Sequence, residues 1–431
     1  MNLYDIIIVG AGPVGISIAR KLDRKYKVLI IEKKKVISID KSWAVPRTWL
    51  EKASFDKYIG NEINKIGLYS YLNDNYSTLK LPSNYKGGVI DSEIFFKDSI
   101  RIIKQKSFYI LKDTEIIRYI KKRNTVTLES QKGNKYKSRL IIDCSGVNSI
   151  FIKDSRNLNR IFYYSLYGIR YENSKLDPHC TFIPAFLGQD KKGHNILVNN
   201  LSEDGKSCLL WSMILDKKKH NISYMREFFE NIRRSKFWND NFLGFKEVGE
   251  QYGIIPLKKS KPFVQKRILS LGDAGAYAPW ANGMSLSFTI KNLHIIISRI
   301  ENSLENNRLK INNLKKVFSY TKDEELNYEF NKLLYIYAMN STPKQLTEII
   351  ELFKGKNSLH FLKIIIYLNE SLNSFKKITF SIIKKFKLKN FLHIISKDGW
   401  KQEVISLNNI FKNRIENLFL KFKNNLTSFS F

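Results

Sequence analysis

The sequence of 431 residues predicts an α/β fold built on a parallel sheet, and the order of its apolar runs carries that prediction. An apolar run at residues 5–9 leads through the glycine-rich turn 10–15 into a helical pattern and a second apolar run at 27–31. Later runs at 138–143 and 267–271 also end in glycine turns. Apolar strands that alternate with helices form sheets covered on both faces.

The first 31 residues read as one βαβ unit. Residues 5–9 (Asp-Ile-Ile-Ile-Val) are almost continuously apolar, as a strand buried on both faces requires. Residues 16–25 have helical periodicity, and 27–31 (Lys-Val-Leu-Ile-Ile) repeat the buried-strand pattern. We therefore expect a Rossmann-type domain at the start of the chain.

Caps, turns and periodicity predict the following elements. Asp91 is a good N-cap, so a helix is expected to begin after it and to run past Ile103. Short strands are expected at 108–111, 116–120 and 126–129, and a buried strand at 138–143. Further on, the runs 196–198 and 208–215 flank the turn Ser202-Glu-Asp-Gly205, which predicts a long hairpin. The strand 267–271 leads into a glycine-rich loop, and a helix is expected over 284–300.

These elements predict three parts of the chain. A discontinuous cofactor domain is expected at residues 1–150 and 259–300. A β-rich substrate domain at 151–258 interrupts it, and a helical, Lys-rich region at 301–431 follows. The chain is long enough for each part to bury a core.

The formal charge is +33, from 73 Lys and Arg against 40 Asp and Glu. Such an excess attracts polyanions, either nucleic acid or an anionic membrane surface. The alternative is an AT-rich genome, because Lys, Ile and Asn are all abundant. Residues 351–431 hold 15 Lys or Arg against 5 Asp or Glu, a composition typical either of basic helices on a membrane or of a packed tail with a solvated Lys face.

Other patterns limit the function classes. Cys144, Cys180 and Cys208 are far apart and form no C-x-x-C, and the six His have no metal-ligand spacing, so neither disulfides nor a metal site are expected. The N-terminus has no signal-peptide pattern, and no apolar run reaches the roughly 18 residues of a membrane span. We expect a cytoplasmic protein with at most peripheral membrane contact.

Gly10-Ala11-Gly12-Pro13-Val14-Gly15 is a G-x-G-x-x-G motif between a strand and a helix. Gly10 allows the tight turn, Gly12 lets a pyrophosphate approach the backbone, and Gly15 lets the helix pack on the strand. Pro13 gives up only an N–H that a helix start does not need. Glu32 ends the second strand, where a carboxylate accepts hydrogen bonds from adenosine ribose hydroxyls. These residues predict a dinucleotide site.

A second glycine turn follows strand 267–271. Gly272-Asp273-Ala274-Gly275 places a carboxylate at the strand end, where it can bind the ribityl hydroxyls of FAD. Pro279 and Gly283 follow, and Met284 begins the expected helix, whose positive end would stabilise the charge of reduced flavin. Together the two turns predict non-covalently bound FAD.

These motifs and the strand ending Asp143-Cys-Ser-Gly146-Val-Asn-Ser149 resemble, in order and spacing, one flavoprotein superfamily. It includes aromatic monooxygenases, flavin halogenases, geranylgeranyl reductases and lycopene cyclases. The segments Ser42–Leu50 and Gly88–Asp91 look most like lycopene cyclases. The resemblance covers residues 1–300 and implies a fold like that of glutathione reductase and hydroxybenzoate hydroxylase.

The chain departs from its relatives at three points. Cyclases carry an acidic pair on a substrate-domain strand, but the matching strand here, Leu209–Leu215, has no carboxylate before Asp216. Cyclases also usually lack the acid that Asp273 supplies. NADPH-using monooxygenases have Asp-Gly where this chain has Ser145-Gly146.

The resemblance places Arg47 near the flavin, where it would contact reduced flavin or an acidic substrate group; a surface ion pair is the alternative. The loop from Tyr277 to Trp280 passes close to the flavin in relatives. Trp43 and Trp49 either wall an apolar pocket with that loop or pack in the core. The sequence identifies no catalytic acid or base.

We therefore expect an FAD-dependent oxidoreductase, a reductase or a monooxygenase, that acts on a small or medium apolar organic substrate such as a prenyl or aromatic compound. A transient NAD(P)H donor stays open. The alternatives are a redox-neutral isoprenoid cyclase that needs reduced FAD, and a flavoprotein that binds tRNA or other nucleic acid. No aromatic-and-basic RNA motif appears, so nucleic acid is the least favoured partner. The sequence does not fix an oligomeric state.

Overall fold

The structure, a computed structural model, divides the chain into two compact units, Met1–Lys322 and Asp323–Phe431. In the second unit, Glu324, Glu325, Tyr328 and Asn331 are described, so the elements below belong to the first. The structure describes residues 2–331 with gaps at 38–42, 71–74, 154–161, 173–176, 178, 184–206, 217, 235–243, 258–262, 276–277, 279–284, 319–320, 322–323, 326–327 and 329–330.

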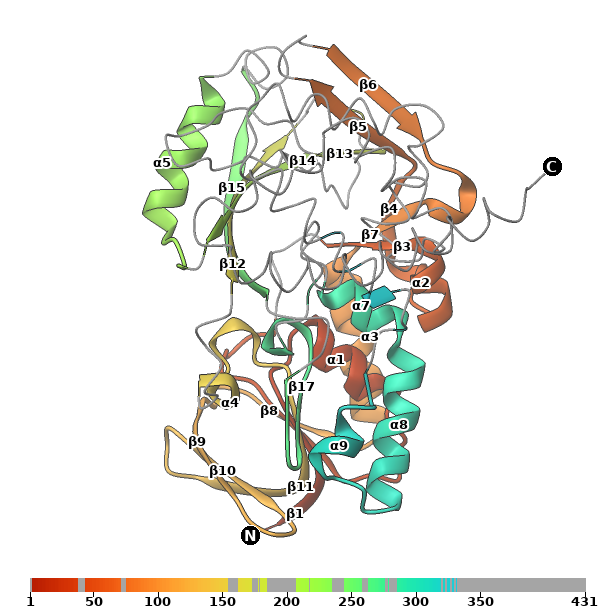
Figure 1. The fold of residues 1–431 in the computed structure, drawn as a ribbon, viewed down its shortest axis with the longest axis vertical. Helices are drawn as coiled ribbons and strands as arrows, with labels where there is room; N and C mark the ends of the chain where they lie inside the picture. The colour runs from red at the N-terminus through yellow and green to blue at the C-terminus, as the bar shows by residue number, and fades with distance from the viewer. Residues whose placement is uncertain are drawn as a thin grey trace, which may run out of the picture. The chain divides into compact units, whose positions relative to one another are not determined.

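A parallel sheet forms the centre of the N-terminal part (Figure 1). Its strands are β1 (Leu3–Val9), β2 (Val28–Ile31), β8 (Tyr109–Leu111), β11 (Lys135–Asp143) and β17 (Ile268–Ser270). Their order is β17-β11-β1-β2-β8, and every neighbouring pair is parallel. The predicted α/β fold class is confirmed. Strand β17 follows the β-rich segment in the chain but pairs with β11 from the first part.

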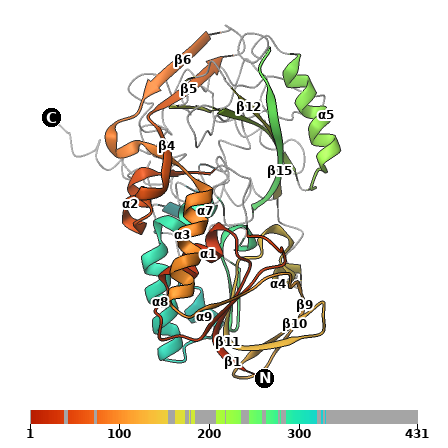
Figure 2. The same cartoon turned by 180° about the vertical axis from the view of Figure 1, so that it is seen from behind.

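Three helices lie on one face of this sheet: α1 (Pro13–Lys21), α3 (Ser92–Gln105) and α8 (Leu293–Glu305) (Figures 1 and 2). Helix α1 contacts both other helices and strands β1 and β2. The predicted cap of α3 is confirmed, because the Asp91 carboxylate accepts a hydrogen bond from the Ile94 amide at 2.9 Å.

The opposite face is covered by the hairpin of β9 (Ile116–Lys121) and β10 (Val126–Ser130), with β10 antiparallel to β11. Helix α4 (Ile150–Lys153) contacts β9. Alternate residues of the parallel strands meet this hairpin in one buried cluster: Ile7, Val9, Leu29, Ile31, Ile116, Val126, Leu128, Ile141, Phe151 and Ile268.

A second, antiparallel sheet has the order β14-β12-β15. Its strands are β12 (Phe162–Glu172), β14 (Ser207–Asp216) and β15 (Glu247–Leu257), and helix α5 (Ile222–Arg233) packs on it. The strand predicted at 208–215 is thus confirmed, but its described partner is β12. The predicted partner, 196–198, lies outside the described residues.

The segment from residue 44 to residue 90 holds five strands that the sequence did not reveal. They are β3 (Ala44–Pro46), β4 (Ile59–Ile63), β5 (Lys65–Ser70), β6 (Asn75–Lys80) and β7 (Gly87–Ile90). One sheet has the order β3-β7-β4, and the other has the order β13-β5-β6. In the latter, β13 (Cys180–Ile183) pairs with β5 in parallel.

The helix predicted over 284–300 is wrong in being continuous. It is divided into α7 (Ser285–Lys291) and α8, and Asn292 stands between them. The Asn292 side-chain amide donates to the Phe288 carbonyl at 2.9 Å. An Asn side chain that bonds the local backbone competes with helix continuation. The remaining elements are α2 (Arg47–Ala53), α9 (Ile311–Leu314), β16 (Val264–Gln265), and the 3₁₀ turns Asp56–Tyr58, Ser83–Tyr85, Gly146–Asn148 and Gly272–Gly275.

Candidate functional site

The candidate site lies at the carboxyl ends of β1 and β11. Strand β1 lies between β2 and β11 in the sheet. The chain continues from β1 to β2 on one side and later reaches β11 on the other side, so the strand order reverses at β1. Ligands bind at such a switch point in open α/β sheets. Gly10 follows β1 with a φ of +103°, and a Cβ there would lie 2.4 Å from the Cys144 carbonyl oxygen. Only glycine allows these two strand ends to approach so closely.

Gly15 and Gly12 of the first glycine turn differ in the space around them: Gly15 is crowded and Gly12 is open. A Cβ on Gly15 would lie 2.0 Å from the Gly10 carbonyl oxygen, so Gly15 is needed for packing. Gly12 has an ordinary φ of −70°, and a Cβ there would meet nothing within 4 Å. Helix α1 begins at Pro13, and no side chain caps its first amides. An uncapped helix start beside open space suits the approach of an anionic group such as pyrophosphate.

Glu32 lies next to this turn, as its position after β2 predicts. Its Oε2 accepts a hydrogen bond from the Ala11 amide at 2.7 Å, and its Oε1 accepts one from the Lys34 amide at 2.9 Å. The side chain is half-buried. The carboxylate therefore stands at the edge of the glycine turn, where a ribose would be recognised.

The second glycine turn packs directly against the first. Gly272 has a φ of +62°, and a Cβ on it would lie 2.9 Å from Cγ2 of Val14. The structure thus brings together two predicted site residues that are far apart in the sequence. The close approach leaves no room for a side chain at Gly272.

Asp143 joins the ends of β11 and β17, a role that the sequence analysis missed. This fully buried carboxylate accepts hydrogen bonds from the Ser145 amide (3.1 Å) and from the hydroxyls of Ser145 (2.5 Å), Ser149 (2.6 Å) and Ser270 (2.8 Å). Burial raises the pKa of Asp143, and these hydrogen bonds oppose the rise. The sequence signal that could have found this role is an acid at the end of an apolar run, because a buried carboxylate needs hydrogen-bond donors around it.

Asp273 lies in the 3₁₀ turn after β17 and is half-buried. The Ser285 hydroxyl at the start of α7 donates to its Oδ1. This contact ties the second glycine turn to the following helix. Four of the predicted residues of the second turn and its loop lie outside the described residues, as does the first helix position: Tyr277, Pro279, Trp280, Gly283 and Met284.

Arg47 is the first residue of α2, not a loop residue, and its guanidinium is engaged in ion pairs. Its Nε lies 3.0 Å from Glu51 Oε1, and its Nη1 lies 2.5 Å from Glu62 Oε2. Lys86 also pairs with Glu62, at 2.6 Å. Hydrogen bonds to Glu51 and Glu62 raise the pKa of Arg47. With 45% of the side chain exposed, this arrangement favours a surface ion pair over a contact with flavin or substrate.

Trp43 and Trp49 are core residues. Trp43 is buried, donates its indole N–H to the Ser92 hydroxyl at 2.8 Å and packs edge-on against Phe95. Trp49 is buried against Phe288, with ring centroids 5.1 Å apart. Packing, rather than a pocket wall, is their observed role.

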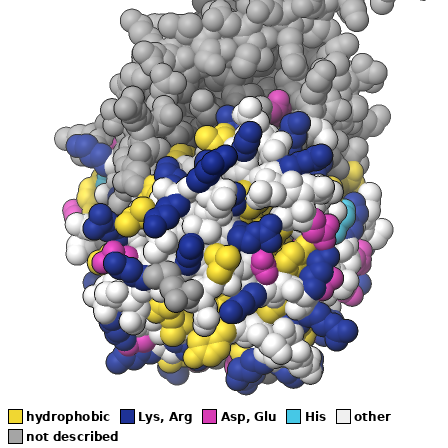
Figure 3. Space-filling model, turned by 90° about the horizontal axis from the view of Figure 1, so that it is seen from below, with side chains coloured by type: hydrophobic (Ala, Val, Ile, Leu, Met, Phe, Trp, Pro, Cys, Tyr) yellow, Lys and Arg dark blue, Asp and Glu magenta, His cyan; other side chains and the backbone are white. Residues whose placement is uncertain are grey.

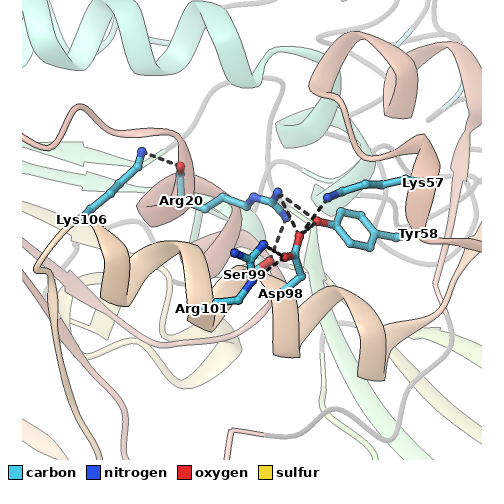
Figure 4. A network of polar contacts seen from close by, with 7 residues as sticks. All are labelled: Arg20, Lys57, Tyr58, Asp98, Ser99, Arg101 and Lys106. Carbon is cyan, nitrogen blue, oxygen red and sulfur yellow. Dashed lines mark hydrogen bonds and ion pairs between the residues drawn. The ribbon is translucent and has the colours of Figure 1, made fainter.

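A buried arginine anchors α1 behind the glycine turn (Figure 4). Arg20 donates to the hydroxyls of Ser99 and Tyr58, each at 3.0 Å, and lies 3.9 Å from the Asp98 carboxylate. Its guanidinium also stacks over Phe55, at 4.8 Å from the ring centroid. Helix α1 is thereby fixed against α3.

Lys106 binds the C-terminal end of the same helix. Its ammonium donates to the carbonyls of Arg20 at 2.7 Å and Leu22 at 2.6 Å, at the C-terminus of α1. A cation at this end is favoured by the helix dipole. Burial lowers the pKa of Lys106. These contacts hold the helix whose opposite end forms the candidate phosphate site.

Within the described residues, no group of three or more His, Cys, Asp and Glu could hold a metal ion. Cys144, Cys180 and Cys208 are all free thiols. No helix in the described part of the chain is long and apolar enough to cross a membrane.

Comparisons with known proteins identify the fold. No protein-family model matches the chain. No curated protein matches it in sequence either. Among solved structures, a geranylgeranyl bacteriochlorophyll reductase-like protein from Thermoplasma acidophilum is 16% identical with a TM-score of 0.69, covering 90% of this chain and 99% of that one.

Two further structures agree. Halogenase PltM is 11% identical with a TM-score of 0.65, and the match covers 96% of each chain. PqsL from Pseudomonas aeruginosa is 12% identical with a TM-score of 0.55, covering 78% of this chain and 95% of that one. At these identities the similarity establishes a shared fold. The fold that the resemblance implied is thus confirmed, and the chain has the fold of this reductase-like protein, the halogenase and PqsL.

Proposed function

We propose that this chain binds FAD non-covalently and is an FAD-dependent oxidoreductase, a reductase or a monooxygenase. One observation carries the proposal. Two glycine turns from distant parts of the chain meet at Val14 and Gly272, on the carboxyl side of a sheet switch point, and the space above Gly12 is open. A single extended dinucleotide explains why both turns are needed at one place.

The residues present fit FAD. Gly12 and the uncapped start of α1 would hold the pyrophosphate, Glu32 the adenosine ribose and Asp273 the ribityl chain. When bound, the flavin supplies hydride transfer and oxygen chemistry. The described residues would position these groups, because the buried contacts of Asp143 join two strand ends and those of Arg20 fix helix α1.

The fold relatives support an organic substrate of the aromatic or prenyl class. One structure of PltM holds phloroglucinol and FAD, and one of PqsL holds 2-aminobenzoylacetate. PqsL is also described as a probable FAD-dependent monooxygenase. The reductase-like relative is named for a geranylgeranyl compound. We carry the aromatic or prenyl class over to this chain as part of the proposal.

The redox-neutral cyclase is the weaker candidate. Strand β14 has no carboxylate before its last residue, Asp216. That carboxylate lies 3.0 Å from Nε2 of His220, at the edge of the sheet. Because no acidic pair stands within the strand, nothing there supplies the proton that polyene cyclisation requires.

Ser145 bears on the electron donor. It stands where NADPH-using monooxygenases have Asp, and both its amide and its hydroxyl are bonded to Asp143. This difference argues against direct binding of NADPH, so we propose NAD(P)H at most as a transient donor.

The test begins with the absorption spectrum of the purified protein and with its uptake of added FAD. Gly12→Asn is the decisive variant. Asn is a good N-cap, so the helix start is kept, but its side chain fills the open space. We expect unchanged stability of the flavin-free protein and loss of FAD binding. The control, Gly133→Asn, lies in a remote turn with equally open surroundings and should bind FAD normally.

Turnover then assigns the reaction. NADH, NADPH and oxygen consumption are followed against a panel of prenyl and aromatic compounds. Flavin-dependent consumption supports the oxidoreductase. Cyclised lycopene from the dithionite-reduced protein, without net use of electrons, would favour the cyclase instead. A colourless protein that takes up no FAD overturns both.

A further inference from the structure

Three segments without any acidic residue converge at one place on the surface. Residues 116–128, 263–271 and 306–318 together hold ten Lys or Arg and no Asp or Glu. The turns of these segments surround an open depression of about 440 Å³. Its lining residues are Lys121, Lys122, Arg123, Val264, Gln265, Lys266 and Ile311.

Arg267 holds the three segments together. Its amide donates to the Leu309 carbonyl at 3.0 Å, and its Nε donates to the Arg123 carbonyl at 3.2 Å. Its Nη1 donates to the Arg139 carbonyl at 3.1 Å. Arg267 is 5% exposed and adopts a φ of +63°, a left-handed conformation that is unfavourable for a side chain of this size. A buried arginine with an unfavourable backbone conformation thus holds these cationic turns close together.

The cations that line the depression are not neutralised. The Lys121 ammonium donates to Gln265 Oε1 at 2.6 Å, a neutral acceptor. Over the described ranges, no ion pair includes Lys121, Lys122, Arg123 or Lys266. Like charges gathered without counter-charges repel one another, so the arrangement suits a function that supplies the anions from outside.

Apolar side chains lie among these cations. Ile311 is 41% exposed at the depression, and Val264, which also lines it, is half-buried. Figure 3 shows this side of the molecule, where Lys and Arg are spread over the face with apolar side chains and a smaller number of Asp and Glu side chains between them. Lys and Arg among exposed aliphatic side chains are typical of surfaces that meet phosphate head groups and the outer acyl region together.

We propose that this basic face, formed by the seven residues lining the depression, docks on an anionic membrane. Nucleic acid fits it less well, because single-stranded binding uses aromatic stacking platforms and no aromatic residue lines the depression. The face precedes strand β17, whereas Gly272 follows that strand, so docking leaves the glycine turns free. An apolar substrate dissolved in the bilayer would then be close to the enzyme.

Vesicle flotation of the full-length protein tests the proposal. The vesicles are phosphatidylcholine alone or with phosphatidylglycerol, at physiological ionic strength. The patch variant carries Lys121→Gln, Lys122→Gln, Arg123→Gln and Lys266→Gln. The charge-matched control carries Lys52→Gln, Lys104→Gln, Lys218→Gln and Arg234→Gln, all exposed positions elsewhere.

We expect the wild type to float with phosphatidylglycerol vesicles, and the patch variant to lose about fivefold in partition coefficient for each cation removed. The control should retain most of its binding. An apolar substitution separates lipid from other anions. Ile311→Ser should weaken flotation, whereas Ile94→Ser, which changes an exposed residue elsewhere, should not.

Three results overturn the proposal. The first is equal loss in the patch variant and its control, which would show only the effect of overall charge. The second is tighter binding to tRNA than to vesicles with no effect of the Ile311→Ser substitution. The third is that inorganic phosphate occupies the basic face and so prevents the protein from binding vesicles. Flotation requires no turnover, so its outcome is separate from that of the proposed flavin chemistry.

Discussion

The Ser270 hydroxyl donates a hydrogen bond of 2.8 Å to the carboxylate of Asp143, between residues that end two neighbouring parallel strands. The loops that follow these strands carry Gly146 and Gly272. Both side chains are fully buried, so water cannot replace the contact. The relative position of the two loops therefore depends on it.

Ser270→Ala should lower both stability and flavin affinity. Removing the hydroxyl leaves a buried carboxylate with one donor fewer, at a cost of about 1–3 kcal/mol in the free energy of unfolding. Urea unfolding measures the first effect, and fluorescence titration with FAD measures the second.

Ser212→Ala is the control for this variant. Ser212 is also fully buried and donates to the Tyr167 carbonyl at 3.1 Å, but it lies in the antiparallel sheet. We expect a loss of stability with unchanged FAD affinity. An equal loss of affinity in both variants would show that Ser270 acts only through global stability.

Gly272→Ala should disrupt the meeting of the two glycine turns. The added methyl would lie 2.9 Å from the branched side chain of Val14, and the residue would keep a left-handed backbone. Gly133→Ala has a similar φ of +76° but open surroundings, so it reports the backbone cost alone, about 1 kcal/mol.

We expect Gly272→Ala to cost about 1–3 kcal/mol more than Gly133→Ala, the usual range for overpacking. Paired denaturation curves of the two flavin-free variants measure the difference. Equal costs would contradict the close packing of Gly272 on Val14.

Acid should remove the contribution of Asp98. Hydrogen bonds from Tyr58, Arg101 and Lys57 hold the pKa of this carboxyl well below its usual range. A lowered pKa in the folded state stabilises the protein above the unfolded value of about 3.9. That contribution is lost as the pH falls through the folded-state pKa.

Asp98→Asn should therefore reduce the free energy of unfolding by about 2 kcal/mol at pH 7, and the gap from wild type should close as the pH falls below 4. Urea titrations across this pH range measure it. Asp113→Asn, which removes an exposed pair with Lys132, should show a smaller gap. A gap that does not change with pH would refute the assignment to the carboxylate.

Arg47→Gln should have little effect on flavin binding. Its guanidinium is bonded to Glu51 and Glu62 at the surface, where ion pairs contribute little and are screened by salt. Any change in melting temperature should shrink at high salt. A marked loss of FAD affinity in this variant would instead restore the cofactor role that the family resemblance implies.

The sequence predicted the parallel sheet and the glycine turns because their signals are local. A strand buried on both faces is continuously apolar, as the last four residues of β1 and all of β2 are, and the turn after β1 has a fixed spacing. The N-cap at Asp91 is local in the same way.

The missed features depend on distant partners. Strands β3 and β7 are short and acquire their partners from remote residues, so neither length nor alternation marks them. Arg20 finds Tyr58 and Ser99 on other elements, and Asp143 finds Ser270 across the chain. No spacing rule links such residues before the fold is known.

The parallel pairing of β13 with β5 has a consequence for how this protein can be divided. Strand β13 belongs to the middle third of the chain, yet it completes a sheet begun before residue 80. A fragment of residues 151–258 would hold β13 without β5, and the rest of the chain would expose the edge of β5. The segment before residue 80 and residues 151–258 therefore depend on each other, so neither can be expressed or exchanged without the other.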